Sequence, residues 1–512
     1  MKKRTGIIVA VAVVIVFIVY LALSQGKKEE VSNTGGGLKD EIIYCQGSDI
    51  TTMDINQGIQ ERACALTNNM FDSLFAFDEN MKVIPCLATE YKWLDDKTLE
   101  LKIRSGVKFH DGSTMTPDDV AFSLNRINEK GSLFGNSYER TEIINDNTVK
   151  VHLKFPNPAF VNLLAVPYAG IVPKKVVESD PDGFGKHPVG TGPYKFKEAK
   201  EGDYYTIERF DDCWNGKAKT KFITLKIVPE TAQRAILLET GDVDAAYEIA
   251  PSNIKRIQDN KDLKVLTCNT MKVIMLNMNC ESKGPVGNVK VRKAIAAAID
   301  KSVIVDQLLH GYGRVANSMI PPEAKEYEEQ PLGSYDPEQA KKLLAEAGYA
   351  KGCNIRLITD GAQTSTEAAQ VIQSQLAKVG IQVKLTVQDP NTTNSMLKAH
   401  QDFDIIMDFF NLVAGHADLV YKRVLYSTSS SNWCYYNNPK YDKAYDAYTV
   451  TPEGQKRDEL RKKVNSFFIT DVPVIPLWGE KKIIGAQKSL EGLKLSPIGS
   501  HEYQNATVAP RK

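Results

Sequence analysis

The sequence predicts a mixed α/β protein with two or three domains. Segments with the two-residue period of strands alternate with segments of helical period, and no internal repeat is present, which is typical of α/β folds. The chain has 512 residues, of which 42% are hydrophobic and 25% charged, so it can bury more than one core. We therefore expect a large globular body.

The spacing of apolar residues places the main strands and helices. The clearest helix follows Asp336, which is placed to cap it, and has Pro337 at its first position, Gln339 at its third and Gly348 beyond its end. Strands are expected at 41–45, 223–228, 273–278 and 381–387, and helices at 231–240, 290–310 and 337–347.

Residues 101–127 combine a strand, a turn and a capped helix. Apolar and charged residues alternate over 99–104, which predicts a half-buried strand, and Asp111-Gly112 marks a turn. Thr116 is placed to cap a helix whose first residue is Pro117. The apolar face of this helix consists of Val120, Leu124 and Ile127.

This stretch resembles the "LR.GVKFHDG" run of the family 5 extracellular solute-binding proteins, with KFHDG at 108–112 as its core. Members of that family bind dipeptides, oligopeptides, nickel chelates and related solutes and deliver them to ABC importers. Further motifs similar to those of the family follow in its order beyond about residue 41. They are HPVGTGPY at 187–194, DCW at 212–214, ETGDVD at 239–244, VRKAI to DK at 291–301, YDP to GY at 335–349, QLAKVGIQV at 375–383 and VPVIPL at 472–477.

The resemblance implies a two-lobed, periplasmic-binding-protein-like (Venus-flytrap) α/β fold, with a discontinuous first lobe that carries an inserted subdomain. Two crossings between the lobes would act as a hinge, and the lobes would close around a ligand. The expected parts are a signal or membrane-anchor segment at 1–24, a flexible tether at 25–40, a first lobe at 41–67, 187–268 and 478–512, its inserted subdomain at 68–186, and a second lobe at 269–477.

The N-terminus predicts export. Lys2-Lys3-Arg4 precedes an uncharged apolar run over 7–23, whose 17 residues are at the lower limit for crossing a bilayer. Many relatives are lipoproteins held through a Cys directly after this run, but the first Cys here is Cys45. We expect an uncleaved anchor on the extracytoplasmic face of the membrane, with cleavage near Ser24 and secretion as the alternative.

Charge and motifs argue against other classes of function. Beyond residue 40 the chain carries 58 basic residues (64 minus 6) and 60 acidic residues (63 minus 3), so nucleic acid is not an expected partner. No HExxH, GxSxG or Walker A motif occurs, and we expect no enzymatic activity and no cofactor. The expected partners are a small solute or peptide and the ABC permease subunits, and the protein is expected to be a monomer. The eight cysteines form no CxxC pair, so mostly unpaired thiols are expected.

The residues that should identify the ligand lie between 403 and 433. A strand is expected at 403–407, followed by a cleft loop at 409–418. In peptide-binding relatives this loop carries an aspartate that binds the amine of the ligand, but here no carboxylate lies between Asp408 and Asp418. Dipeptide-binding relatives also hold the carboxyl end with an arginine, which residues 359–363 lack. Both differences weaken a dipeptide assignment.

Three classes of ligand stay open: an oligopeptide, which is favoured, a nickel or other metal chelate, and an opine, amino-acid conjugate or sugar. Aromatic side chains would stack on any of them, and Asn432 would donate a hydrogen bond in the cleft or cap a turn. His416 would bind metal only if the ligand is a chelate. A ligand-sensing receptor is the alternative class of function. The candidate ligand-binding residues are Tyr247, Phe409, Phe410, Asn411, His416, Asn432 and Trp433.

Overall fold

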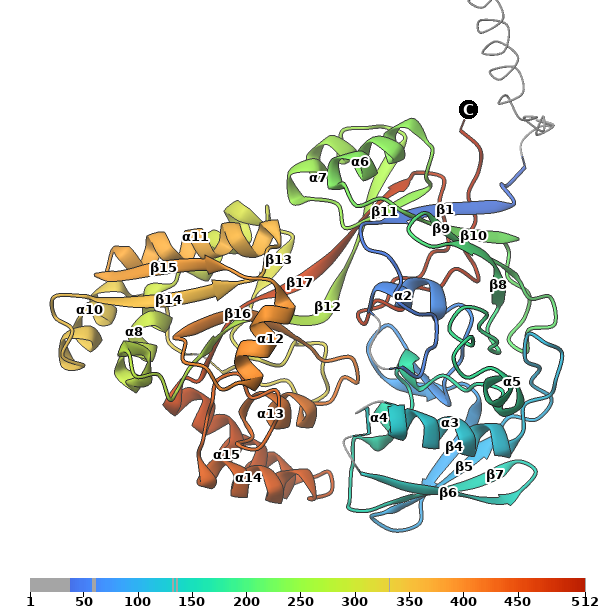
Figure 1. Cartoon of the computed structure of the whole chain (residues 1–512), viewed down its shortest axis with the longest axis horizontal. Coiled ribbons are helices and arrows are strands. Elements are labelled where there is room, and N and C mark those ends of the chain that lie inside the picture. The colour runs from blue at the N-terminus through green and yellow to red at the C-terminus, as the bar shows by residue number, and fades with distance from the viewer. Residues whose placement is uncertain (1–36, 58–60, 131–132, 135–136, 331, 512) are drawn as a thin grey trace, which may run out of the picture. The chain divides into compact units, whose positions relative to one another are not determined.

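One 11-stranded sheet runs through the chain, which the computed structural model describes at residues 37–57, 61–130, 133–134, 137–330 and 332–511 (Figure 1). Its strand order is β15-β14-β16-β12-β17-β11-β1-β10-β9-β8, and β13 pairs with β17. The bounds are β1 (Glu41–Gln46), β8 (Tyr194–Lys200), β9 (Tyr204–Arg209), β10 (Phe222–Ile227), β11 (Ala245–Tyr247), β12 (Leu263–Met278), β13 (Gly313–Val315), β14 (Cys353–Thr359), β15 (Ile381–Val387), β16 (Ile405–Asn411) and β17 (Val474–Gln487).

The two long strands β12 and β17 connect the two halves of this sheet (Figure 1). They pair antiparallel from Leu263 opposite Gln487 to Asn277 opposite Val474. The pairing register shifts between Asn269 and Val273. This irregularity divides each of the two strands into two sections. One section lies beside β11 and β1, and the other lies beside β16 and β14.

Helices cover the half of the sheet that contains β14, β15 and β16. Asp336 caps α10 as predicted, because its Oδ1 accepts a hydrogen bond from the Gln339 backbone N–H at 2.9 Å. The predicted continuous helix at 290–310 is wrong. Its chain leaves the helix at Ile299, and Asp300 caps a new turn by accepting from Ser302 N at 3.0 Å. The elements here are η2 (Pro285–Gly287), α8 (Val289–Ala298), α9 (Lys301–Val303), the π-helical turn η3 (Ile304–Leu308), α10 (Pro337–Glu346), α11 (Gln363–Ala377) and α12 (Pro390–Lys398).

The other half of the sheet buries its own core. Tyr44, Leu225 and Tyr503 are fully buried, and so is Ile484 on β17. The predicted helix at 231–240 is confirmed as α6, which packs Leu238 against the sheet. The helices here are α2 (Glu61–Thr67), α6 (Thr231–Thr240) and α7 (Pro251–Gln258).

A separate four-stranded antiparallel sheet, with order β4-β5-β7-β6, packs against α3 (Figure 1). The sequence prediction for 99–127 is confirmed: Thr116 Oγ1 accepts from Asp119 N at 3.4 Å, and Asp119 Oδ2 accepts from Thr116 N at 2.8 Å. The apolar residues of both patterns are buried. The elements are β2 (Phe75–Phe77), β3 (Val83–Pro85), β4 (Ala88–Trp93), β5 (Thr98–Ile103), α3 (Pro117–Lys130), β6 (Tyr138–Asn145), β7 (Thr148–Leu153), α4 (Phe160–Leu163), η1 (Pro167–Ala169) and α5 (Lys174–Ser179).

The strand that leads to the predicted ligand-binding loop is longer than expected. β16 continues to Asn411, so Phe409, Phe410 and Asn411 lie in a strand and pair with Ile274, Val273 and Lys272 of β12. The loop therefore consists of 412–417 only. Three helices follow in the chain: α13 (Asp418–Leu425), α14 (Pro439–Thr449) and α15 (Gln455–Asp471).

The predicted export segment at 1–24, and the part of the tether up to residue 36, lie outside the described residues. Among the described residues, no helix combines the length and apolar character needed to cross a bilayer.

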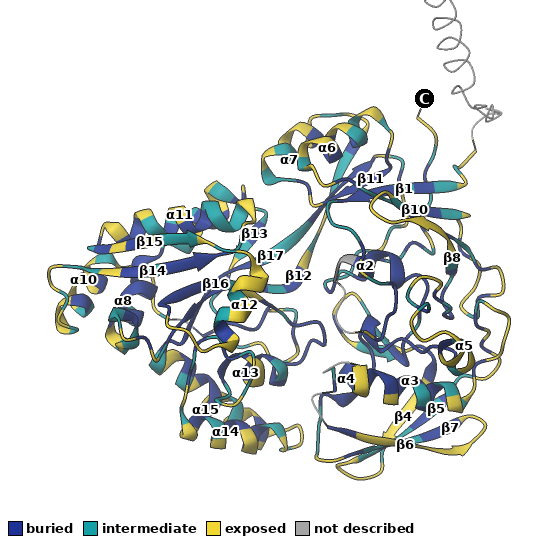
Figure 2. Cartoon of the chain, viewed as in Figure 1, coloured by how far each residue is buried: buried dark blue, intermediate teal, exposed yellow. Residues whose placement is uncertain are grey.

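All eight cysteines are described, and the structure forms no disulfide between them. Five of the cysteines are buried. Figure 2 shows the buried parts of the chain in dark blue. Burial raises the pKa of Cys45 to about 12 and that of Cys213 to about 11. These thiols should therefore react slowly in the folded protein.

A thiol titration tests this assignment. With Ellman's reagent, the denatured protein should show eight thiols, with or without prior reduction. The native protein should show fewer fast-reacting thiols, because burial blocks access and disfavours the thiolate. A denatured count that rises after reduction would contradict the assignment.

Candidate ligand-binding site

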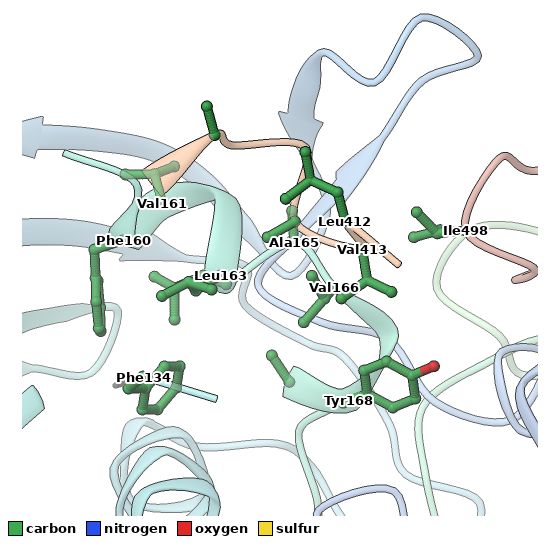
Figure 3. Packing of buried hydrophobic residues seen from close by; sticks show 14 of the residues in the cluster. Phe134, Phe160, Val161, Leu163, Ala165, Val166, Tyr168, Leu412, Val413 and Ile498 are labelled. Atoms are coloured by element: carbon green, nitrogen blue, oxygen red, sulfur yellow. The ribbon is translucent and has the colours of Figure 1, made fainter. Parts of the chain in front are cut away.

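The loop at 412–417, called here the β16–α13 loop, lies against the part of the chain that carries the four-stranded sheet. Figure 3 shows Leu412 and Val413 among Ala165, Val166 and Ile498. Asn162 Nδ2 donates to Ala414 O at 3.1 Å, and Leu412 N donates to Met271 O at 2.9 Å. The loop is thus tied to β12 on one side and to the 160–169 segment on the other.

The three predicted residues on β16 face different environments. Phe409 is 41% exposed, and the Lys272 ammonium lies 4.0 Å from the centre of its ring. Phe410 is buried in the core, and the buried Asn411 Oδ1 has no hydrogen-bond partner among the described residues. Phe409 is therefore the member of this group whose ring is open to a ligand.

Asn432 and Trp433 hold the turn that follows α13. Asn432 Oδ1 accepts from Tyr436 N at 3.1 Å, and its Nδ2 donates to Tyr436 O at 2.8 Å. Trp433 is half-buried against the apolar cluster that includes Phe403 and Leu397. The amide of Asn432 is therefore already used by the backbone.

Tyr247 belongs to a buried aromatic group on the opposite half of the large sheet. Its hydroxyl lies 2.8 Å from the Tyr503 hydroxyl, and its ring stacks on His501 at 5.5 Å. Burial raises the pKa of Tyr247 and lowers that of His501 to about 3, so both side chains are neutral at physiological pH. The side chain of Tyr247 is 3% exposed.

His416 lies in a buried ion network. Its Nδ1 lies 3.5 Å from Glu326 Oε2 and 3.5 Å from Asp418 Oδ1. The donor atoms of these three residues lie within 4.8 Å of one another, a spacing compatible with a metal ion. Arg457, however, donates to both carboxylates, at 3.1 Å to Glu326 and 2.7 Å to Asp418, so a cation of the protein itself is already bound to both of them. We therefore describe the group as an ion network.

Sequence reasoning missed a cavity of about 390 Å³ that lies beside β2 and β3. Its polar wall contains Asp72, Arg104 and Trp214. Asp72 Oδ2 accepts from Trp214 Nε1 at 2.8 Å and from Thr191 Oγ1 at 2.9 Å, and the Arg104 guanidinium lies 4.4 Å from the centre of the Trp214 ring. Arg104 Nε donates to Cys86 O at 3.1 Å.

The cavity presents both an unsatisfied cation and an acidic group. The two Nη groups of Arg104 have no acceptor among the described residues, and Asp72 Oδ1 has no donor there. Burial raises the pKa of Asp72, although the hydrogen bonds from Trp214 and Thr191 oppose this shift. Such a wall can bind a carboxylate and an amine together.

These residues were missed because they are far apart in the chain and because the motifs that contain Arg104 and Trp214 were used to identify the family and not the ligand-binding residues. Arg104 is the last residue of the strand pattern at 99–104, before the KFHDG motif, and Trp214 is the last residue of the DCW motif at 212–214. A cluster assembled from such distant segments leaves no spacing signal in one sequence. The family motifs themselves were the available signal.

A second cavity, of about 950 Å³, lies between the four-stranded sheet and the segments at 323–325 and 450–453. Its wall is mainly apolar and includes Tyr91, Trp93 and Val450. His416 lines neither cavity.

Comparison with known proteins identifies the family. The model for bacterial extracellular solute-binding proteins, family 5 Middle, matches residues 82–432. The glutathione-binding protein GsiB of Salmonella typhi is 29% identical over 491 residues, which cover 91% of this chain and 94% of GsiB.

Solved structures share the fold. The ABC transporter substrate-binding protein CtaP of Listeria monocytogenes has a TM-score of 0.84 at 23% identity, covering 92% of this chain and 100% of CtaP. The oligopeptide-binding protein AppA of Bacillus subtilis, in complex with a nonapeptide, has a TM-score of 0.76 at 24% identity, covering 91% and 99%. The fold is thus the two-lobed periplasmic-binding fold, and this chain belongs to family 5 of the bacterial extracellular solute-binding proteins.

Proposed function

We propose that this chain captures a peptide, and most specifically an oligopeptide, outside the cytoplasm and delivers it to the permease of an ABC importer. The observation that carries the peptide assignment is the wall of the smaller cavity, where Arg104 and Asp72 present opposite charges. A peptide has a carboxylate and an ammonium group that suit such a pair. An affinity near micromolar, or about 8 kcal/mol, is expected for this kind of capture.

The missing anchors on the second lobe fit this proposal. Residues 359–363 lack the arginine that dipeptide-binding relatives use, and residues 412–417 lack the aspartate that peptide-binding relatives use. Arg104 and Asp72 would supply the same chemistry from the first lobe and its inserted subdomain, whose residues line the smaller cavity. Main-chain hydrogen bonds along an extended peptide would supply the remaining affinity. Among the predicted ligand-binding residues, Phe409 has the most exposed ring, although it lines neither cavity.

Lobe closure is the proposed motion. We assign the first lobe to 41–67, 187–268 and 478–512, its inserted subdomain to 68–186, and the second lobe to 269–477. The boundaries at 268/269 and 477/478 fall on β12 and β17, close to the register shift between Asn269 and Val273. A small rotation there would move the β16–α13 loop onto or away from the inserted subdomain.

The remaining parts of the proposal concern location and chemistry. The apolar run at 7–23 would hold the protein on the extracytoplasmic face of the membrane, and cleavage near Ser24 would release it. The protein would act as a monomer without cofactor or enzymatic activity. GsiB and AppA, whose names state glutathione and oligopeptide binding, support a peptide-like cargo.

A metal chelate is the less favoured cargo. NikZ of Campylobacter jejuni, solved in complex with Ni(L-His), shares the fold with a TM-score of 0.77. In this chain, however, His416 is engaged with Glu326 and Asp418 in the ion network and does not line the cavities.

Ligand recovery and an Arg104→Ala variant test the proposal. Mass spectrometry of material released from protein purified without refolding should identify peptides. Calorimetry with the recovered peptide should then show that Arg104→Ala weakens binding about tenfold to a hundredfold, the loss expected for one hydrogen bond to a charged group. Arg140→Ala is the matched control, because Arg140 is exposed and lies outside the cavity. Recovery of a metal complex, or unchanged affinity in Arg104→Ala, would refute the assignment.

Asn432→Ala separates a structural role from a ligand-binding role. Loss of the side chain leaves the backbone groups of Tyr436 without partners, so unfolding free energy in urea should fall by roughly 1–3 kcal/mol. Peptide affinity measured well below the unfolding midpoint should not change. A large loss of affinity at unchanged stability would instead place Asn432 against the ligand.

A further inference from the structure

Four charged side chains from three separate segments meet around the β16–α13 loop. His416 comes from the loop, Asp418 from the start of α13, Glu326 from the segment before α10, and Arg457 from α15. The His416, Asp418 and Arg457 residues are 2%, 4% and 2% exposed, and the Glu326 side chain is 12% exposed. Water therefore does little to screen the charges of this network.

The charges of the network balance only if His416 is protonated. Glu326, Asp418 and Arg457 together carry one net negative charge. A buried net charge is costly, so the site favours a second cation. The imidazolium of His416 supplies it at the point where Nδ1 faces both carboxylates at 3.5 Å.

The directions of the pKa shifts of His416 and Asp418 agree with this count of charges. Burial by itself lowers the pKa of His416, but Asp418 and Glu326 outweigh burial, and the pKa is raised. In the same way, burial raises the pKa of Asp418, but His416 and Arg457 outweigh it, and this pKa is lowered. The raised pKa of His416 and the lowered pKa of Asp418 share one cause, which is the attraction between these two side chains.

The network is directly connected to the contact between the loop and the inserted subdomain. Ala414, two residues before His416, accepts the hydrogen bond from Asn162. Gly415 O accepts from Lys325 N at 3.4 Å, and Lys325 is the neighbour of Glu326. The position of His416 therefore fixes the backbone that meets the subdomain.

We propose that His416 is a positioning residue that, as an imidazolium bound to Glu326 and Asp418, holds the β16–α13 loop in the conformation that meets the inserted subdomain. The effect on solute capture rests on the proposed function, whereas the effect on the loop does not. Deprotonation of His416 leaves the buried network with a net negative charge and releases the loop.

The other charged and titratable groups around His416 keep their charge at mildly alkaline pH. Arg457 stays protonated. Burial raises the pKa values of Tyr445 and Tyr448, so both stay neutral. The hydrogen bond from Lys325 lowers the pKa of Glu453, which stays ionised.

The sign of the pH effect follows from the raised pKa. The stabilisation is fully present below the ordinary pKa of histidine, about 6.5, and is lost as pH rises through the higher pKa of the folded protein. The loop should therefore loosen on the alkaline side.

The test combines NMR with hydrogen exchange on the full chain. The ¹³Cε1–H resonance of His416, assigned by its absence in His416→Gln, should titrate above the ordinary pKa of histidine, about 6.5. Protection of the 412–417 amides, corrected for intrinsic exchange, should fall over the same pH range. In His416→Gln the protection should be low and free of this pH step.

Two further variants sharpen the test. His416→Lys keeps a cation that does not titrate in this range, so it should restore protection of the loop without the step. His400→Gln is the matched control, since His400 contacts Glu281 at 3.0 Å but is exposed, and it should behave as wild type. A purely steric role of His416 predicts no rescue by lysine.

The outcomes separate this inference from the proposed function. Titration of His416 at or below the ordinary pKa of histidine, about 6.5, or loop protection that stays flat with pH in the wild type, would overturn it. If His416→Gln does not fold, the pH dependence of loop protection in the wild type still decides. The affinity for a pool of tri- to pentapeptides should fall over the same pH range as the protection of the 412–417 amides. If no peptide binds at any pH, the proposed function fails while the loop measurements still stand.

Discussion

The antiparallel pairing of β12 with β17 is the interaction on which the rest of the structure depends. These two strands contribute to both halves of the large sheet. The other strands of each half pair along the outer edges of the β12–β17 pair. The pairing brings together segments about 200 positions apart in the chain. Once it forms, β11 and β1 can be added on one side and β16 and β14 on the other. The register shift near Asn269 interrupts this ladder between its two sections.

Two sites of charge lie on either side of this framework, and their chemistry differs. Arg104 and Asp72 leave donor and acceptor groups open to a cavity, which suits a ligand. Glu326, His416, Asp418 and Arg457 neutralise one another's charge within the protein when His416 is protonated, which suits a structural or positioning role. Buried charges are stable only when paired, so an open charge in a cavity is the more informative signal of binding.

Local patterns in the sequence were sufficient for many elements. The capping residues Thr116 and Asp336 start their helices as predicted, because a cap acts within three residues of itself. The helix at 231–240 follows from its apolar period and the glycine after it. The break at Ile299 was missed, because Asp300 caps a new turn inside a run whose apolar residues continue the helical pattern. The extension of β16 to Asn411 was missed, because pairing with β12 decides where that strand ends.

The sequence by itself determined the family, the α/β class and most helix starts, because these depend on motifs and on interactions between residues near in the chain. Tertiary structure alone decided which polar groups are open and which are paired. His416 and Asn432 looked equally available in the sequence, yet one lies in an ion network and the other caps a turn. Arg104 looked like scaffold, yet its guanidinium faces a cavity. The availability of a side chain depends on partners contributed by distant segments, and one sequence does not encode those partners locally.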